Sequence, residues 1–139
     1  MKKLVVEHDA YVLLPRKTME DKKVSLSLNV VFNMHYHERN NAKKVVKENV
    51  QRYLEETNQS HIKFDKPVHA TFKMYKPTRR KTDKSNFSAG GCKFIYDALV
   101  ELGHLVDDND DWIKTELLEE TVHDRDNPRI VLTFTEVEE

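Results

Sequence analysis

The chain has 139 residues, enough for one domain with its own hydrophobic core. Apolar residues make up 38% and charged residues 34%, a globular composition that excludes a disordered or fibrous chain. The net charge of −1 excludes a protein that is basic throughout, so any contact with nucleic acid requires a local patch. The single cysteine excludes an internal disulfide and a multi-cysteine zinc site, and it is typical of a reducing compartment.

The N-terminal sequence predicts no targeting segment. Glu7, His8 and Asp9 interrupt the opening apolar run before a signal-peptide core could form. No stretch of the chain reaches the length needed to cross a bilayer. We therefore expect a cytoplasmic protein without a membrane partner.

Two strands are predicted in the first third of the chain. Residues 3–14 form one strand, which we expect to bend near His8 and Asp9 and to end at Pro15. Residues 24–32 form the second, because the apolar residues alternate with Ser25, Ser27 and Asn29 as they do in a half-buried strand. The two strands could pair as a hairpin with a long loop.

The rest of the chain alternates between helical and extended patterns. An amphipathic helix is predicted from Glu38 to about Thr57, and a second from Asn86 to Leu102, with Gly103 as its C-terminal cap. Strands are predicted at residues 66–77, 111–124 and 128–139. The order β-β-α-β-α-β-β predicts one domain, residues 1–139, of the mixed α/β (α+β) class, with two helices packed on a mixed sheet.

Two loops of opposite charge flank the second predicted helix. Asp83 precedes this helix, and Asp107 and Asp108 follow it, so carboxylates from both loops could hold Mg²⁺ or Mn²⁺. A cationic groove leading to such a cluster is typical of metal-assisted phosphodiester cleavage. The cations that could bind a phosphate backbone are Lys73, Lys76, Arg79, Arg80, Lys81 and Lys84.

Each loop also has a simpler interpretation. A run of Lys and Arg is usually a solvated loop, and the acidic loop could serve only to neutralise it. The sequence DDNDD is also typical of a turn, because Asp and Asn favour turns and helix caps.

The second predicted helix carries two further features. Asn86, Lys93 and Asp97 share one face, where Lys93 could stabilise charge on a scissile phosphate or form an ordinary surface pair with Asp97. Gly90 and Gly91 are costly inside a helix, so they mark either a break or a close approach of backbone.

The segment HYHERN places two histidines in a favourable arrangement for metal binding. His35 and His37 would point the same way from a strand, as zinc ligands could. No third ligand of matching spacing follows them, so we favour a polar loop or a phosphate contact.

The stretch TDKSNFSAGGCKFIYDALVELGHLVDDNDDWI, residues 82–113, resembles the central motif of the RusA family of Holliday junction resolvases. The shared pattern is an aspartate and an asparagine at the start, a helix with a lysine and the letters DAL, a glycine, and an Asp-Asp pair before a strand. LSLNVVFNMHYHERNNAKK, residues 26–44, is similar to the opening of phage and prophage members from Gram-positive bacteria. The resemblance covers most of the chain from Leu26 onward.

The resemblance implies a dimeric, Mg²⁺-dependent endonuclease that acts on branched DNA during phage recombination, repair or replication. It implies that Asp83 and Asp108 bind the metal, with Asp107 beside them. Lys93 corresponds to the helix lysine, in a catalytic role together with Asp83 and Asp108. Asn86 corresponds to the motif asparagine, which we group with the DNA-binding residues.

One departure from the family pattern leaves an alternative open. Ser85 stands where the motif has a second metal-binding aspartate, and a neutral hydroxyl is a weaker ligand for Mg²⁺ than a carboxylate. The alternative is a catalytically impaired, RusA-like DNA-binding protein. A third reading is an interaction module whose charges only keep it soluble, and the salt dependence of DNA binding separates that reading from the other two.

Overall fold

The centre of the protein is a mixed five-stranded sheet. The computed structural model describes residues 2–76 and 84–138. The strand order is β1-β7-β4-β5, and β6 pairs with β4 beyond β5. Neighbouring strands are antiparallel except that β4 is parallel to β5 and β6. The strands are β1 Lys3–Asp9, β4 Val68–Lys76, β5 Ile113–Leu118, β6 Val122–His123 and β7 Arg129–Glu136.

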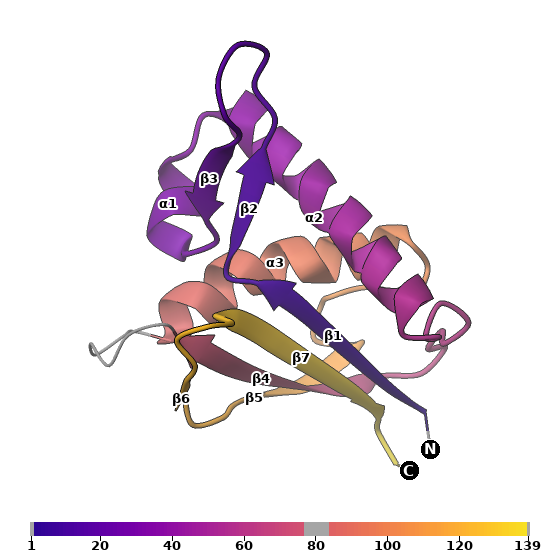
Figure 1. Cartoon of the computed structure of the whole chain (residues 1–139). Helices are drawn as coiled ribbons and strands as arrows, with labels where there is room; N and C mark the ends of the chain where they lie inside the picture. The colour runs from indigo at the N-terminus through magenta and orange to yellow at the C-terminus, as the bar shows by residue number, and fades with distance from the viewer. Residues whose placement is uncertain (1, 77–83, 139) are drawn as a thin grey trace.

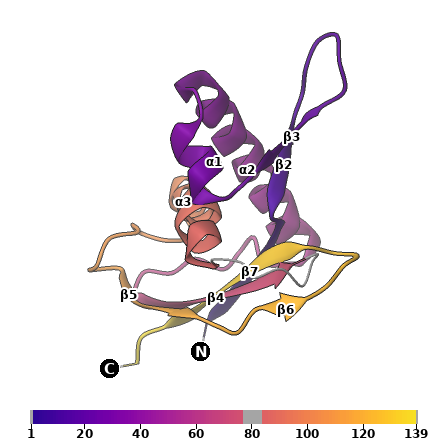
Figure 2. The same cartoon turned by 90° about the vertical axis from the view of Figure 1, so that its left-hand side faces the viewer.

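All helices of the described chain lie on one face of this sheet (Figure 2). They are α1 Leu28–Asn33, α2 Tyr36–Glu56 and α3 Lys84–Glu101. The core lies between the two layers, where alternate residues of β1, β4 and β7 are buried beneath α2 and α3. The predicted class, a mixed α+β fold with helices on a mixed sheet, is confirmed.

A small second sheet projects from this body (Figure 1). β2, Tyr11–Leu14, and β3, Lys22–Ser25, pair antiparallel as a hairpin, as the sequence predicted. The predicted bend after His8 and Asp9 is also confirmed, because it separates β2 from β1 at Ala10. β1 itself pairs with β7 at the edge of the large sheet.

The prediction of a strand at residues 24–32 is wrong in its second half. The strand ends at Ser25, and α1 follows, which adds a third helix to the two that we expected. Arg39 explains the change, because its guanidinium donates to the carbonyls of Val31, Phe32 and Met34 at 3.2, 2.9 and 3.2 Å. The Val31 carbonyl also accepts from the Met34 N–H at 3.4 Å, and the contact from α2 adds a donor to the last carbonyls of the short helix, which a helix end leaves without intrahelical partners.

The predicted strand at residues 111–124 is also shorter than expected. It is interrupted into β5 and β6, and the Glu119 N–H donates to the Phe72 carbonyl at 2.8 Å between them. The strand at 66–77 and the last strand are confirmed as β4 and β7, and the two long helices as α2 and α3.

The two adjacent glycines do not break α3, which runs continuously through both. An added Cβ at Gly91 would lie 3.0 Å from Ile130 Cδ1 and 3.2 Å from Leu26 Cβ. Of the two explanations left open by the sequence, close approach is therefore the one that applies at Gly91. Gly103 ends the helix with φ of +85°, as expected for a C-terminal cap.

No helix in the described part of the chain is both long enough and apolar enough to span a membrane.

Candidate functional site

The fold brings together two of the residues that the sequence singled out. Lys93 lies in α3 and Asp108 in the loop between α3 and β5, and Lys93 Nζ donates to Asp108 Oδ2 at 2.8 Å. Lys93 Nζ also lies 3.1 Å from Oδ1 of Asp97, one helical turn further along α3. Lys93 therefore bridges two carboxylates. One of them, Asp97, belongs to the surface pair that the sequence offered as the simpler interpretation.

The two carboxylates belong to a longer chain of charges between α2 and α3. Lys43 of α2 lies 3.2 Å from Asp97 and 3.9 Å from Glu101, and Lys47 lies 3.1 Å from Glu101. We call this series, from Lys47 to Asp108, the Lys93 network. Sequence reasoning did not include the two α2 lysines, although their spacing of four matches that of Asp97 and Glu101.

The charges of the Lys93–Asp108 pair stabilise each other. The hydrogen bonds to Asp108 and then to Asp97 raise the pKa of Lys93. The hydrogen bond from Lys93 lowers the pKa of the Asp108 carboxyl. Both groups are therefore charged at neutral pH. The Lys93 side chain is 58% exposed, so a phosphate group in solvent can reach it, whereas Asp108 is 22% exposed.

The acidic loop is partly built by its own side chains. Asp107 Oδ1 accepts from the Asp108 N–H at 2.8 Å, and its Oδ2 accepts from Asn109 Nδ2 at 3.3 Å. Asn109 Oδ1 in turn accepts from the Asp111 N–H at 3.0 Å. These bonds fit the turn interpretation of DDNDD, and they also hold the Asp107 carboxylate in place, whereas the Asp108 carboxylate is held by Lys93.

The described residues include two of the three predicted metal ligands, Asp107 and Asp108. Within residues 2–76 and 84–138, no group of three or more His, Cys, Asp or Glu side chains is placed to hold a metal ion. Two adjacent carboxylates nevertheless fit Mg²⁺, because this ion is commonly held by one or two carboxylates and completed by water and phosphate oxygens. Asp83, the third predicted ligand, lies outside the described residues.

The predicted DNA-binding residues fall into three groups. Arg79, Arg80 and Lys81 lie outside the described residues. The backbones of Lys84, Ser85 and Asn86 belong to α3, and their side chains are outside the described part. Lys76 ends β4, and Lys73 lies on the sheet face that no described helix covers, over the Tyr75 ring at 5.4 Å. The structure therefore does not place Lys73 beside Lys93.

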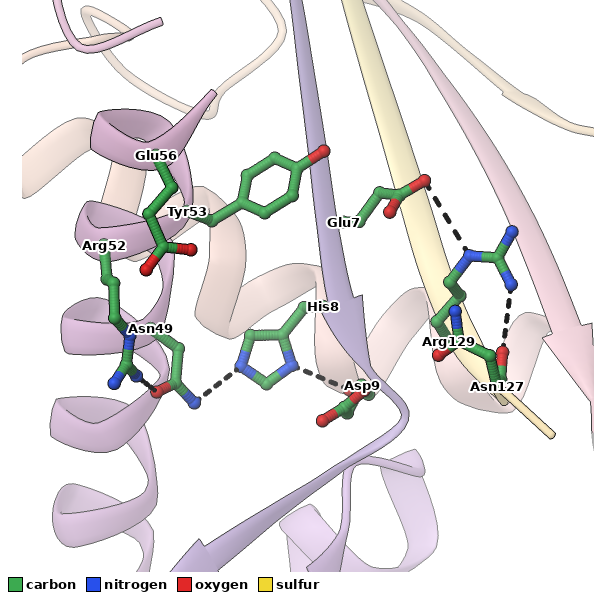
Figure 3. Close-up of a pocket in the computed structure, with 9 residues that line it drawn as sticks. All are labelled: Glu7, His8, Asp9, Asn49, Arg52, Tyr53, Glu56, Asn127 and Arg129. Atoms are coloured by element: carbon green, nitrogen blue, oxygen red, sulfur yellow. Dashed lines mark hydrogen bonds and ion pairs between the residues drawn. The ribbon is translucent and has the colours of Figure 1, made fainter. Parts of the chain in front are cut away.

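A separate polar pocket of about 310 Å³ lies between α2 and the adjacent ends of β1 and β7 (Figure 3). At its base His8 is 7% exposed. His8 Nδ1 lies 2.7 Å from the Asp9 carbonyl, which only accepts, so Nδ1 carries the proton. Nε2 then accepts from Asn49 Nδ2 at 3.2 Å, and Asn49 Oδ1 accepts from Arg52.

We call the series from Asp9 to Arg52 the His8 network. Burial lowers the pKa of His8, which keeps the ring neutral and preserves this direction of the hydrogen bonds. No function was predicted for His8 from the sequence. Its apolar neighbours at two-residue spacing, Leu4 and Val6, were the signal that its side chain faces the core.

No model of a known protein family matches the chain, and no curated protein matches it.

Proposed function

We propose that the chain is a Mg²⁺-dependent endodeoxyribonuclease that cleaves four-way junctions and other branched DNA. The activity would serve phage recombination, repair or replication in the cytoplasm. The observation that carries the proposal is the 2.8 Å contact between Lys93 and Asp108, which are fifteen residues apart in the chain. The RusA-like motif assigns these two residues to one site, and their contact supports that assignment.

In this proposal Asp107 and Asp108 hold the metal together with Asp83. Held by these carboxylates, Mg²⁺ or Mn²⁺ would supply a Lewis acid for the scissile phosphate and for a water molecule. The hydrogen bonds of the acidic loop orient the Asp107 carboxylate, and Lys93 orients the Asp108 carboxylate. Their orientation therefore costs little when the cation binds.

Lys93 is the group that stabilises negative charge on the phosphate. Its ammonium is shared between Asp97 and Asp108, so it can leave Asp108 to a cation and remain anchored on Asp97 at 3.1 Å. A fixed, exposed ammonium beside the metal ligands favours the charge that develops on the phosphoryl oxygens. Asp97 is then a positioning residue for Lys93.

The DNA backbone would be held by the basic side chains at and after the end of β4. Lys76 and Lys73 begin this series, and Arg79, Arg80, Lys81, Lys84 and Asn86 continue it in the sequence. We propose that the protein acts as a homodimer, because a two-fold axis presents two equivalent sites to two strands and yields paired nicks.

A second candidate function is binding of branched DNA without cleavage. Ser85 favours it, because a hydroxyl replaces a carboxylate in the motif. The contact of Lys93 with Asp108 Oδ2 also favours it, since an ammonium there competes with a cation for the same oxygen.

The test is cleavage of a synthetic four-way junction, with a linear duplex of the same length beside it, in Mg²⁺, in Mn²⁺ and in EDTA. We expect metal-dependent paired nicks in the junction alone. Asp108→Asn and Lys93→Ala should each lower the single-turnover rate by about 10²- to 10³-fold, as expected when a group that stabilises transition-state charge is removed. Asp126→Asn is the matched control, because Asp126 lies in another exposed Asp-Asn turn far along the chain.

Two results would decide against this proposal. If Asp108→Asn cleaves as fast as the unmodified chain, the site assignment is wrong. If the unmodified chain binds the junction without nicking it and Ser85→Asp restores nicking, the second candidate function is correct.

A further inference from the structure

The junction between α1 and α2 exposes large aromatic side chains. Phe32 is 74% exposed and Tyr36 is 59% exposed. Among the Phe, Tyr and Trp side chains that the structure describes, Phe32 and Tyr36 are the exposed ones. Large aromatic groups exposed at the surface are a common mark of a binding surface.

Tyr36 belongs to a compact cluster of three rings from consecutive residues. Its ring centroid lies 4.9 Å from that of His35 and 4.0 Å from that of His37, and the ring planes differ by 30° and 35°. The ring centroids of His35 and His37 lie 5.2 Å apart, so the three centroids form a triangle. We call these three consecutive side chains the ring row. All three are exposed, so the cluster presents ring surface to solvent.

The backbone beneath the ring row is fixed by side-chain hydrogen bonds. His35 is the N-cap of α2, and its Nδ1 accepts from the His37 N–H at 3.3 Å. Arg39 ties the last carbonyls of α1 to the first turns of α2. The rings are thus presented by a rigid junction, and a partner would pay little ordering entropy on binding them.

A groove of about 480 Å³ runs beside the ring row, between β3 and the α1–α2 junction. His35 forms part of its wall, Val30 and Met34 give it an apolar side, and Lys22 and Lys23 give it a cationic side. Lys22 is held by Glu38 at 2.6 Å, and Lys23 lies over the Tyr11 ring at 4.2 Å. The volume lies within the range of sites that hold small molecules or single ligand units.

We infer that the ring row and this groove bind unpaired nucleotides of single-stranded DNA. A base would stack on the exposed rings, and the adjoining phosphate would bind Lys22 and Lys23. Single-stranded DNA is generally bound in this way, by aromatic stacking platforms beside cations. Bases within a duplex are already stacked on their neighbours, so the surface selects unpaired ones. The inference rests on the proposed function, in which branched DNA supplies such bases where its strands exchange.

The composition of the groove favours this occupant over an apolar segment of another protein. An apolar segment would make no new ion pair with Lys22 or Lys23. A nucleotide, in contrast, would stack its base on the rings and place its phosphate beside both ammonium groups. The helix before the ring row, α1, packs against α3, the helix that carries Lys93 (Figure 1).

The test measures binding of a fluorescein-labelled fifteen-residue oligothymidylate by fluorescence anisotropy, in EDTA so that cleavage does not occur. We expect Tyr36→Ala and His35→Ser each to weaken binding by about 5- to 100-fold, the range found for loss of one stacking side chain. Serine at position 35 retains an N-cap oxygen and removes the ring. Leu117→Ala is the matched control, because Leu117 is 61% exposed on β5, away from this surface.

A second measurement locates the contact directly. An oligonucleotide that carries 5-iodouracil, irradiated in complex with the full chain, should crosslink within residues 30–37. Crosslinks confined to other segments, or ring variants that bind as tightly as the Leu117→Ala control, would overturn the inference. So would a dimer that the ring variants convert to monomers without any loss of DNA binding, since the surface would then be a protein interface.

The same samples separate this inference from the proposed function. Junction cleavage without measurable binding of the single strand overturns the inference and leaves the nuclease standing. Ring-dependent binding of the single strand without any junction cleavage supports the inference and contradicts the nuclease.

Discussion

The Lys93 network and the His8 network both connect α2 to another element, and they differ in burial and charge. The Lys93 network consists of full charges near solvent, and Lys93, which is 58% exposed, lies next to its Asp108 end. The His8 network consists of hydrogen bonds that run through a ring only 7% exposed. Exposed ion pairs contribute little to stability, whereas buried polar groups are costly once a partner is lost. We therefore expect the first network to affect activity and the second to affect stability.

The largest effect on stability is expected at Gly91, which belongs to neither network. It lies two residues before Lys93 but faces the core, so a substitution there should affect stability as a buried position does. Gly91→Val should lower the free energy of unfolding by about 1–3 kcal/mol, the usual cost of overpacking. Its Cβ would meet Leu26 Cβ at 3.2 Å, and Leu26 cannot move freely because its N–H donates to the Ala10 carbonyl at 3.0 Å. Urea unfolding measures the change.

Lys44→Val is the control for Gly91→Val, since Lys44 lies on an exposed face of α2. It should change stability only by the few tenths of a kcal/mol by which Val is a weaker helix former. Equal effects of the two substitutions would mean that α3 does not pack against β7 at Gly91 as described.

The His8 network should make stability depend on pH. The pKa of His8 in the folded chain lies below its ordinary value of 6.5 because the ring is buried, so the unfolded chain takes up the proton first. The free energy of unfolding should therefore fall as pH drops from 7.5 to 5, by at most about 1.4 kcal/mol per pH unit for one proton. Urea unfolding of the unmodified chain and of His8→Gln, subtracted at each pH, removes the contribution of the other histidines.

Asn49→Asp provides the opposing variant for the His8 experiment. A carboxylate facing Nε2 accepts a hydrogen bond from the charged ring, so the pKa of His8 should rise and the loss of stability at low pH should shrink. NMR titration of the imidazole resonances measures this directly. A His8 pKa at or above 6.5 in the unmodified chain would contradict the burial described here.

The smallest effect is expected for the stability of the Lys93 network. Lys93→Met should change the free energy of unfolding by less than about 1 kcal/mol, as for other exposed ion pairs. Raising NaCl from 50 to 500 mM should reduce even this difference, because salt screens exposed charges. Lys47→Met, at the other end of the network, is the control. A loss of several kcal/mol for Lys93→Met alone would assign Lys93 to the architecture of the fold.

Local patterns were enough to predict α2, α3, β4 and β7, because their apolar residues repeat with a single period and their ends carry Pro67, Pro77 and Gly103. The segment 26–32 was mispredicted because its alternation fits a strand. Its helical form depends on Arg39, which is distant from that pattern. A propensity for one local structure was thus overridden by a tertiary contact.

The candidate site was predicted only in part, for a similar reason. The motif identified Lys93 and Asp108, which the structure brings into contact. The Lys43–Asp97 contact depends on how α2 crosses α3, and the Lys22, Lys23 and His35 groove depends on α1, which the sequence did not predict. Residues that meet through the packing of two elements leave little signal in either element alone.

The lone Cys92 lies beside Lys93 in α3 with 2% exposure, and burial raises the pKa of its thiol. A thiol reagent in solution reacts with a thiolate that it can reach, so it modifies Cys92 only while α3 is transiently open. The rate of labelling thus measures how often the helix that carries Lys93 opens locally. Cys92 is therefore a built-in reporter of local unfolding at the candidate active site.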